Sequence, residues 1–258
     1  MITGINKNSM NRKTIIPLGT FLILTASLGA QVKFSGHHYY NTFSTSTIEP
    51  RLVEVIDGVS TIHYSLSKAD FNGSPYLSEE FVEGTMTVSD GTVIPGLKYR
   101  YDIYGDKMQF ILNRDTAVIN RPMAVRSLVM GDRKFVYEVY MVQANRVATG
   151  YFEMIRENEN LTILYRRKIE IEQDIYVPNY GGGGGTKEFE MKQDNSYYVK
   201  HGNSAAQKIH SRKGLLKIIP DYRDRVKQYM KDHRLSVKKE KDLAAIADYY
   251  NSLHTDGS

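Results

Sequence analysis

The chain has 258 residues, 41% hydrophobic and 24% charged, so it can bury a core, and disorder throughout is excluded. The absence of cysteine excludes disulfides, thiolate metal sites and cysteine nucleophiles. The net charge of +5 is uneven: residues 1–30 hold three cations and no acid, residues 199–258 hold 13 cations against 7 acids, and the remainder is slightly acidic, with 18 cations against 22 acids.

The first thirty residues have the three regions of a secretory signal peptide, in the required order. These are the cations Lys7, Arg12 and Lys13, the apolar run 15–26, and the small residues Ser27, Gly29 and Ala30. We expect residues 1–30 to be removed by cleavage after Gly29 or Ala30, with either Met1 or Met10 as the start. The run is shorter than the roughly 20 apolar residues that cross a bilayer, so no transmembrane segment is expected in the mature chain.

Residues 31–48 are rich in Ser, Thr, Asn and His, and they predict a poorly ordered leader. Residues 49–199 instead contain strand-length runs rich in tyrosine and phenylalanine, which favour β-sheet. Turn signals separate these runs at Asp57-Gly58, Asp90-Gly91, Tyr104–Asp106, Asn113–Asp115, Gly131–Arg133 and 157–160. The short spacing predicts an antiparallel meander of about eight to ten strands, forming a twisted sheet or a partly closed barrel.

Alternating apolar and polar residues support this prediction, because successive side chains of a strand point to opposite faces. One strand places Leu97, Tyr99, Tyr101 and Ile103 on one face, with Lys98, Arg100 and Asp102 opposite. The run 135–142 is largely apolar on both faces, which indicates a central strand.

A second alternating run contains one charged residue on its apolar face. Leu161, Ile163, Tyr165, Ile169 and Ile171 share that face with Arg167, while Arg166, Lys168, Glu170 and Glu172 form a charged outer face. An unpaired charge on an apolar face is costly, so Arg167 would need a partner such as Glu153 or a ligand there. A bulge that turns Arg167 outward is the commoner explanation of such a pattern, and we expect it here.

Residues 200–258 predict a helical segment docked on the β domain. The five glycines 181–185 precede it and form a loop tip. A first helix follows Asp221, the expected N-cap, and a second begins at about residue 239. Their apolar stripes are Ile219, Tyr222, Val226 and Met230, then Leu243, Ile246, Ala247, Tyr250 and Leu253. Docking of these two amphipathic helices would leave Lys227, Lys231 and Lys238 on a basic outer face for a partner.

Several segments resemble a group of exported, β-rich proteins common in Bacteroidota. They are Asn72–Phe81 with Gly84, Leu97–Tyr104, Gly150–Met154, Leu164–Arg167, and Asp242-Leu243 with Tyr249–Asn251. The resemblance covers most of the mature chain and implies a Gram-negative envelope. It carries over no activity, ligand or catalytic residue.

No motif assigns a catalytic, cofactor-binding or metal-binding residue. His37-His38 and His63 lack the spacing of zinc ligands, and Glu79-Glu80 and Glu170 with Glu172 are interpreted as solvated carboxylates, not a glycosidase pair. We therefore expect a non-catalytic envelope protein that serves as a binding or assembly module without a cofactor. Its expected partner is an envelope protein, glycan or anionic lipid, and not nucleic acid. The alternatives are a carrier of an apolar ligand such as lipid, and a hydrolase of unrecognised type.

Overall fold

The computed structural model describes residues 71–177 and 186–255, all of which lie in one compact unit, Val32–Ser258. The signal peptide, the leader, the three histidines discussed above, the turn Asp57-Gly58 and the glycine run 181–185 lie outside the described residues. Predictions about them stay predictions.

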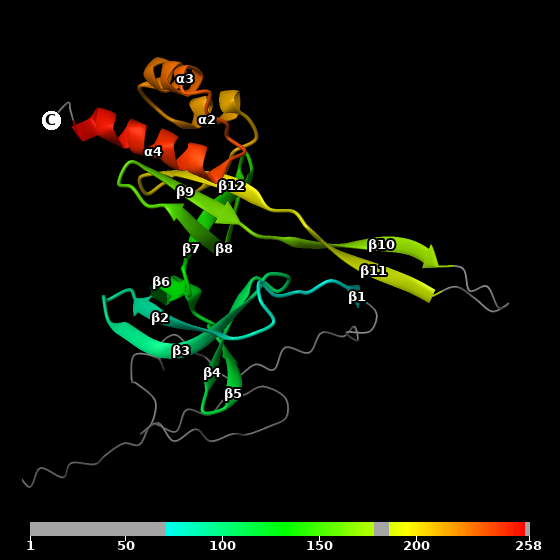
Figure 1. Ribbon diagram of the computed structural model, residues 1–258. Helices are drawn as coiled ribbons and strands as arrows, with labels where there is room; N and C mark the ends of the chain where they lie inside the picture. The colour runs from blue at the N-terminus through cyan, green and yellow to red at the C-terminus, as the bar shows by residue number, and fades with distance from the viewer. Residues whose placement is uncertain (1–70, 178–185, 256–258) are drawn as a thin grey trace, which may run out of the picture. The chain divides into compact units, whose positions relative to one another are not determined.

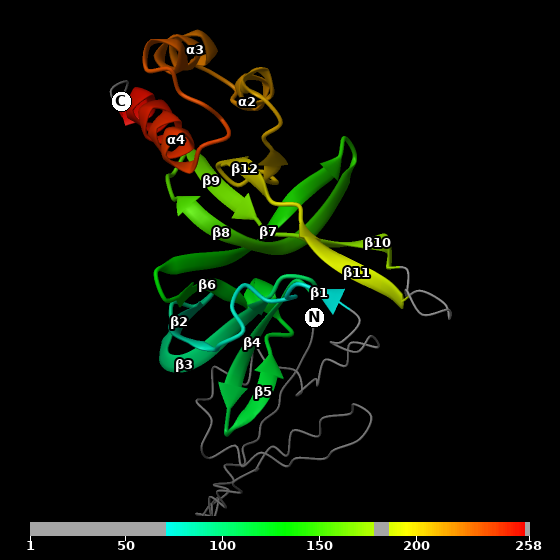
Figure 2. The same ribbon diagram turned by 45° about the vertical axis from the view of Figure 1, so that its right-hand side comes forward.

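Ten antiparallel strands form the main sheet, which curls into a half-barrel (Figure 2). Its strand order is β13-β12-β9-β8-β7-β6-β2-β3-β4-β5, and the predicted antiparallel meander is confirmed. The strands are β2 (Val82–Val88), β3 (Val93–Asp102), β4 (Lys107–Leu112), β5 (Asp115–Val118), β6 (Val125–Met130), β7 (Arg133–Gln143), β8 (Arg146–Arg156), β9 (Leu161–Arg166), β12 (Ser196–His201) and β13 (Gln207–Lys208). As predicted from its two apolar faces, β7 lies in the middle of the sheet.

Two connections depart from a simple meander. After β5 the chain passes through a short 3₁₀ helix, η3 (Pro122–Ala124), and β6 then pairs with β2. After β9 the chain leaves the main sheet and builds a second sheet of order β1-β11-β10. This sheet consists of β1 (Phe71–Asn72), β10 (Ile169–Val177) and β11 (Thr186–Gln193).

The second sheet continues a ribbon that begins in the first one. Arg166 pairs with Ser196 at the end of β9 and β12, and three residues further on Ile169 pairs with Gln193, so the register does not change. The single alternating run predicted for residues 161–172 therefore describes one long ribbon. The break at Arg167-Lys168 divides this ribbon between the two sheets (Figure 1).

The predicted turns form where glycine or asparagine tolerates a positive φ. Gly91 has a φ of +91°, and the Val88 N–H donates to the Thr92 carbonyl at 2.9 Å, which closes the β2–β3 hairpin. Asn113 and Arg114 have φ values of 51° and 74° and form the two-residue turn between β4 and β5.

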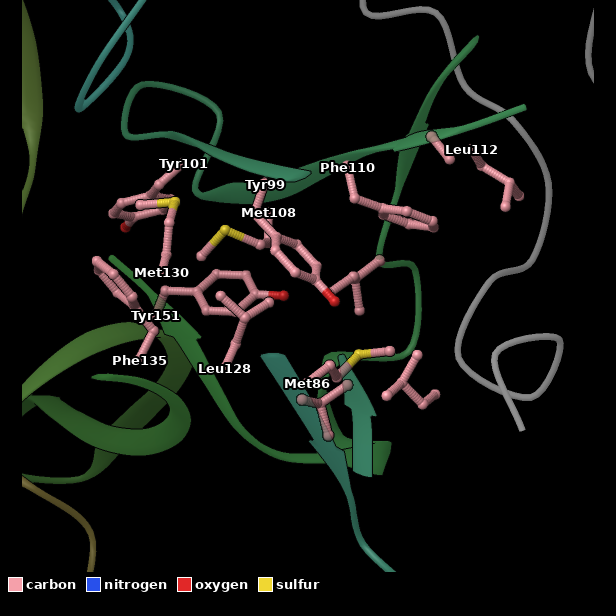
Figure 3. Close-up of a cluster of buried hydrophobic side chains, with 14 of the residues drawn as sticks. Met86, Tyr99, Tyr101, Met108, Phe110, Leu112, Leu128, Met130, Phe135 and Tyr151 are labelled. Atoms are coloured by element: carbon pink, nitrogen blue, oxygen red, sulfur yellow. The ribbon is translucent and has the colours of Figure 1, made fainter. Parts of the chain in front are cut away.

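Large aromatic and sulfur-containing side chains fill the interior of the half-barrel (Figure 3). Met86, Tyr99, Met108 and Phe110 are fully buried. Tyr99 packs over β2 at Gly84, where an added Cβ would lie 2.2 Å from the Val129 carbonyl oxygen and 2.9 Å from the Tyr99 ring.

One carboxylate of β3 is not where the sequence placed it. Asp102 was expected on the outer face with Lys98 and Arg100, but it is completely buried. Its Oδ1 accepts a hydrogen bond from the Gly105 N–H at 2.9 Å, which closes the turn between β3 and β4. The Gly105 N–H in the turn needs a hydrogen-bond acceptor, and Asp102 supplies it, so the Asp102 side chain is buried although the alternation of the strand places it on the outer face.

Two tyrosines of this core should respond oppositely to removal of the hydroxyl group. The buried Tyr99 hydroxyl has no hydrogen-bond partner in the part of the chain that the structure describes, and burial raises its pKa. The Tyr101 hydroxyl donates to Asp106 at 2.7 Å. We expect Tyr99→Phe to be neutral or to stabilise the fold by up to about 1 kcal/mol, and Tyr101→Phe to cost about 2 kcal/mol. Urea unfolding of both variants measures the difference, and equal losses would contradict the assignment.

The chain ends in three helices, one more than the sequence predicted. They are α2 (Arg212–Ile218), α3 (Arg223–Asp232) and α4 (Glu240–Thr255). The Ser211 hydroxyl accepts from the Gly214 N–H at 3.0 Å and caps α2, a short helix that the apolar spacing did not predict.

The predicted N-cap at Asp221 is wrong. Pro220 holds Ile219 in an extended conformation, which ends α2, and α3 then begins at Arg223 after Tyr222, whose φ is +50°. Asp221 instead accepts hydrogen bonds from the Tyr250 hydroxyl and contacts His254 Nε2 at 3.2 Å, so it links the α2–α3 connection to α4.

The apolar faces of the helices pack on the sheet at β9 and β12, and α4 lies along β9 (Figure 1). The helical residues of this cluster are Leu215, Ile219, Val226, Met230, Leu243, Ile246, Ala247, Tyr250 and Leu253, and the strands contribute Leu161, Ile163 and Val199. Arg156 and Asn158 bind Asp248 at its rim. None of the helices within the described ranges is long and apolar enough to cross a membrane.

Candidate functional site

Arg167 and Glu153, the pair singled out in the sequence, form an ion pair. Nη2 and Nε of Arg167 lie 2.6 and 3.1 Å from Glu153 Oε2, and Arg133 Nη1 lies 3.1 Å from both carboxylate oxygens. The side chains of Arg167 and Glu153 are only 15% and 12% exposed. The charge on the apolar face is therefore neutralised inside the protein, and a bulge does not turn it outward.

The Glu153 cluster joins three parts of the fold. Arg133 begins β7, Glu153 lies on β8, and Arg167 is the point at which the chain leaves the main sheet. Both oxygens of Glu153 accept hydrogen bonds from guanidinium groups. This arrangement is suited to fixing the branch point between the two sheets.

Arg166 was expected on the solvated outer face, and that expectation is wrong. Its side chain is 13% exposed and forms an ion pair of 3.1 Å with Asp106, a residue of the β3–β4 turn. Its guanidinium group also lies 4.6 Å from the centre of the Tyr140 ring. Glu170 and Glu172 do lie on an exposed face, where they pair with Lys168 and Lys192.

The Asp106–Arg166 pair occupies a position where the sheet lacks backbone partners. The last paired residues of β8 and β9 at this end are Glu153 and Tyr165, so β9 provides no backbone hydrogen-bond partner for Tyr151. The Tyr151 N–H donates to Asp106 Oδ1 at 3.2 Å, and its carbonyl accepts from Arg166 Nη1 at 3.3 Å. Two side chains thus replace the missing strand and satisfy the backbone groups.

Electrostatics and sterics both depend on this close packing. Burial works against the charge of Arg166, but Asp106, together with Tyr140 and Tyr101, raises the pKa of Arg166 above its ordinary value. Burial, and then Asp106, raise the pKa of Tyr101. A Cβ at Gly150 would lie 2.1 Å from Arg166 Nη1, so glycine is needed where the guanidinium group crosses β8.

A polar cleft of about 390 Å³ opens on the main sheet. Its floor includes Thr162 of β9, whose neighbours Leu161 and Ile163 point to the helices, so the cleft lies on the opposite face. Lys200 in the cleft pairs with Glu138 at 2.7 Å, and each side chain is about one-fifth to one-quarter exposed. The remaining lining residues are Met154, Glu157, Asn158, Glu159, Gly202 and Asn203.

In the part of the chain that the structure describes, no three His, Asp or Glu side chains converge in a manner suited to a metal ion.

Glu79, one of the paired carboxylates noted in the sequence, is engaged in local contacts. Its side chain accepts a hydrogen bond from the Ser74 hydroxyl at 2.5 Å, and its backbone carbonyl accepts from Arg100 at 3.1 Å. These contacts give Glu79 a structural role at the start of the fold.

Lys227, Lys231 and Lys238, the predicted basic face, are exposed on α3 and on the connection to α4. They belong to a larger set of exposed cations within residues 212–241, which we call the basic helical surface. Its members are Arg212, Lys213, Lys217, Arg223, Arg225, Lys227, Lys231, Arg234, Lys238, Lys239 and Lys241. Eleven cations against four acids, Asp221, Asp224, Asp232 and Glu240, give this segment a net charge of +7.

The cations of the strands and of the helices differ in their partners. Eight strand and loop cations form ion pairs with carboxylates: Arg133, Lys134, Arg156, Arg166, Arg167, Lys168, Lys192 and Lys200. Among the described residues, no carboxylate forms an ion pair with any of the eleven cations of the basic helical surface. The fold leaves their charge available to an external anion.

No protein-family model, curated protein or solved structure matches the chain. The candidate site is therefore defined by its own charges and geometry.

Proposed function

We propose that this protein is a non-catalytic, exported component of a bacterial envelope that binds an anionic partner through the basic helical surface. The observation that carries the proposal is the set of eleven exposed cations that have no carboxylate partner within residues 71–177 and 186–255. Like charges held close together repel one another, and an external anion relieves that repulsion. The order of charge, apolar run and small residues in residues 1–30 supports export.

The packed interior supports a binding module over a carrier of an apolar ligand. A carrier needs an internal apolar space, whereas Met86, Tyr99, Met108 and Phe110 fill the half-barrel and are fully buried. The ion pairs of Glu153 and Asp106 with arginines likewise favour a structural role for these two carboxylates over the proton transfer that a hydrolase needs.

Binding of polyphosphate, a simple polyanion, tests the proposal. We expect the chain of residues 31–258 to bind polyphosphate at low salt and to lose this binding as salt increases, because salt screens exposed charges. The triple variant Lys227→Glu, Lys231→Glu, Lys238→Glu should bind far more weakly. Its melting temperature should barely change, since exposed charges contribute about 0 to 1 kcal/mol each.

Fluorescence anisotropy of labelled polyphosphate measures the binding, and calorimetry measures the melting temperature. Unchanged binding by the triple variant would show that the basic helical surface is not the binding surface.

A further inference from the structure

We infer that the basic helical surface binds the headgroups of an anionic lipid bilayer, as a peripheral contact without insertion. This inference rests on the proposed function, because it names the partner of the same surface. Three features of the surface carry it: the arrangement of the cations, the absence of exposed apolar anchors, and the internal use of the helices' apolar faces.

Three cations of α3 lie along one side of the helix. Arg223, Lys227 and Lys231 follow one another at intervals of four residues, which places them in one row. At 1.5 Å per residue, the row is about 12 Å long. A row of this length can contact several lipid headgroups at once.

A second group of cations adjoins the end of this row. Arg212 Nη2 donates to the Leu235 carbonyl at 2.7 Å, so the start of α2 lies against the segment that joins α3 to α4. The charge of Arg212 therefore lies at the chain neighbour of Arg234, although 22 residues separate the two in the sequence. Cations from three segments form one surface, which is a broad target and not a single anion pocket.

The surface lacks the anchors that a protein or glycan partner would use. Between residues 212 and 241 the only exposed large apolar side chain is Tyr222, at 36%. Its ring packs edge-on against His254, with 5.0 Å between ring centres. The residues that dominate protein interfaces are tryptophan, tyrosine and arginine packed into desolvated pockets, and within residues 212–241 the surface offers arginines but no exposed tryptophan or tyrosine apart from Tyr222. A contact between many cations and many equivalent lipid headgroups does not need an aromatic or apolar anchor.

The apolar faces of the helices are already used inside the protein. Val226 and Met230 of α3 are completely buried in the cluster on β9 and β12. A helix that inserts into a bilayer needs an apolar face turned outward. Here the contact must be electrostatic, and each cation adds to it to a similar degree.

Vesicle sedimentation of residues 31–258, which contain the whole described structure, tests the inference. The probes are vesicles of phosphatidylcholine alone, and vesicles of equal parts phosphatidylcholine and phosphatidylglycerol. We expect binding only to the anionic vesicles, and a loss of about 100-fold in affinity for Lys227→Glu, Lys231→Glu, Lys238→Glu.

A matched control reverses three exposed strand cations that form no ion pair with any other described residue: Lys98→Glu, Lys107→Glu, Arg126→Glu. It has the same net charge as the helical variant and should lose less than about 10-fold in affinity, because only distant charges change. Equal losses in both variants, or equal binding to neutral vesicles, would overturn the inference. Binding to polyphosphate without binding to anionic vesicles would overturn the lipid partner and leave the proposed function standing. Binding to neither probe would overturn both.

Discussion

Glu153→Gln is expected to destabilise the protein by about 3 kcal/mol, a large effect for a single atom exchange. Glu153 pairs with both Arg133 and Arg167 at distances of 2.6 to 3.1 Å, and its side chain is 12% exposed. Removal of one partner from a buried ion pair leaves the other charge uncompensated, which costs about 3 to 5 kcal/mol. Because the Arg133 side chain is 39% exposed and partly solvated, we expect a loss of stability at the lower end of this range.

The matched control is Glu172→Gln, which removes a carboxylate that pairs with Lys192 at 2.9 Å on an exposed face. It should cost less than about 1 kcal/mol, because water solvates both charges. Chemical denaturation of the two variants and the parent measures the difference. If Glu153→Gln loses no more than Glu172→Gln, the Glu153 cluster does not stabilise the branch point between the sheets.

Deletion of residues 212–258 should produce a chain that aggregates or melts several degrees lower. The helices cover Leu161, Ile163 and Val199, which are completely buried on the sheet and would become an exposed apolar patch. Size-exclusion chromatography and thermal melting measure the outcome. A truncated chain that stays monomeric with an unchanged melting temperature would show that the sheet does not need the helices.

A point variant tests the same interface if the truncated chain cannot be purified. Ile246 on α4 is completely buried, and Ile246→Ala should cost about 2 to 5 kcal/mol through lost burial and a cavity. Lys241→Ala, at an exposed position of the same helix, should change the stability by less than about 0.5 kcal/mol. Similar small losses in both variants would show that α4 packs loosely.

Local patterns were sufficient for the parts of this fold that depend on neighbouring residues. Alternation placed Tyr99 and Tyr101 in the core, and asparagine and glycine marked the turns at Gly91 and Asn113, where φ is positive. Apolar spacing found α3 and α4. Each of these signals is a periodicity or a backbone preference that a short segment carries by itself.

The same patterns failed where a distant residue changes the environment of a side chain. Arg166 alternates with apolar residues as an outward-facing cation would, yet Asp106 from the β3–β4 turn draws it inward. A glycine in the neighbouring strand, Gly150, gives the guanidinium group room to cross β8, but a glycine by itself does not predict a buried arginine. Nothing in a strand's alternation shows that its neighbour ends early and leaves a backbone N–H and carbonyl to be satisfied.

The sequence by itself determined the strand-rich class, the apolar stripes of the helices and the excess of cations near the C-terminus. Only the tertiary structure decided that Arg167 pairs with Glu153, that one ribbon is shared by two sheets, and that the helical cations have no carboxylate partner among the described residues. The reason is physical: periodicity is a property of a segment, whereas the pairing of charges depends on which segments the packed core brings together.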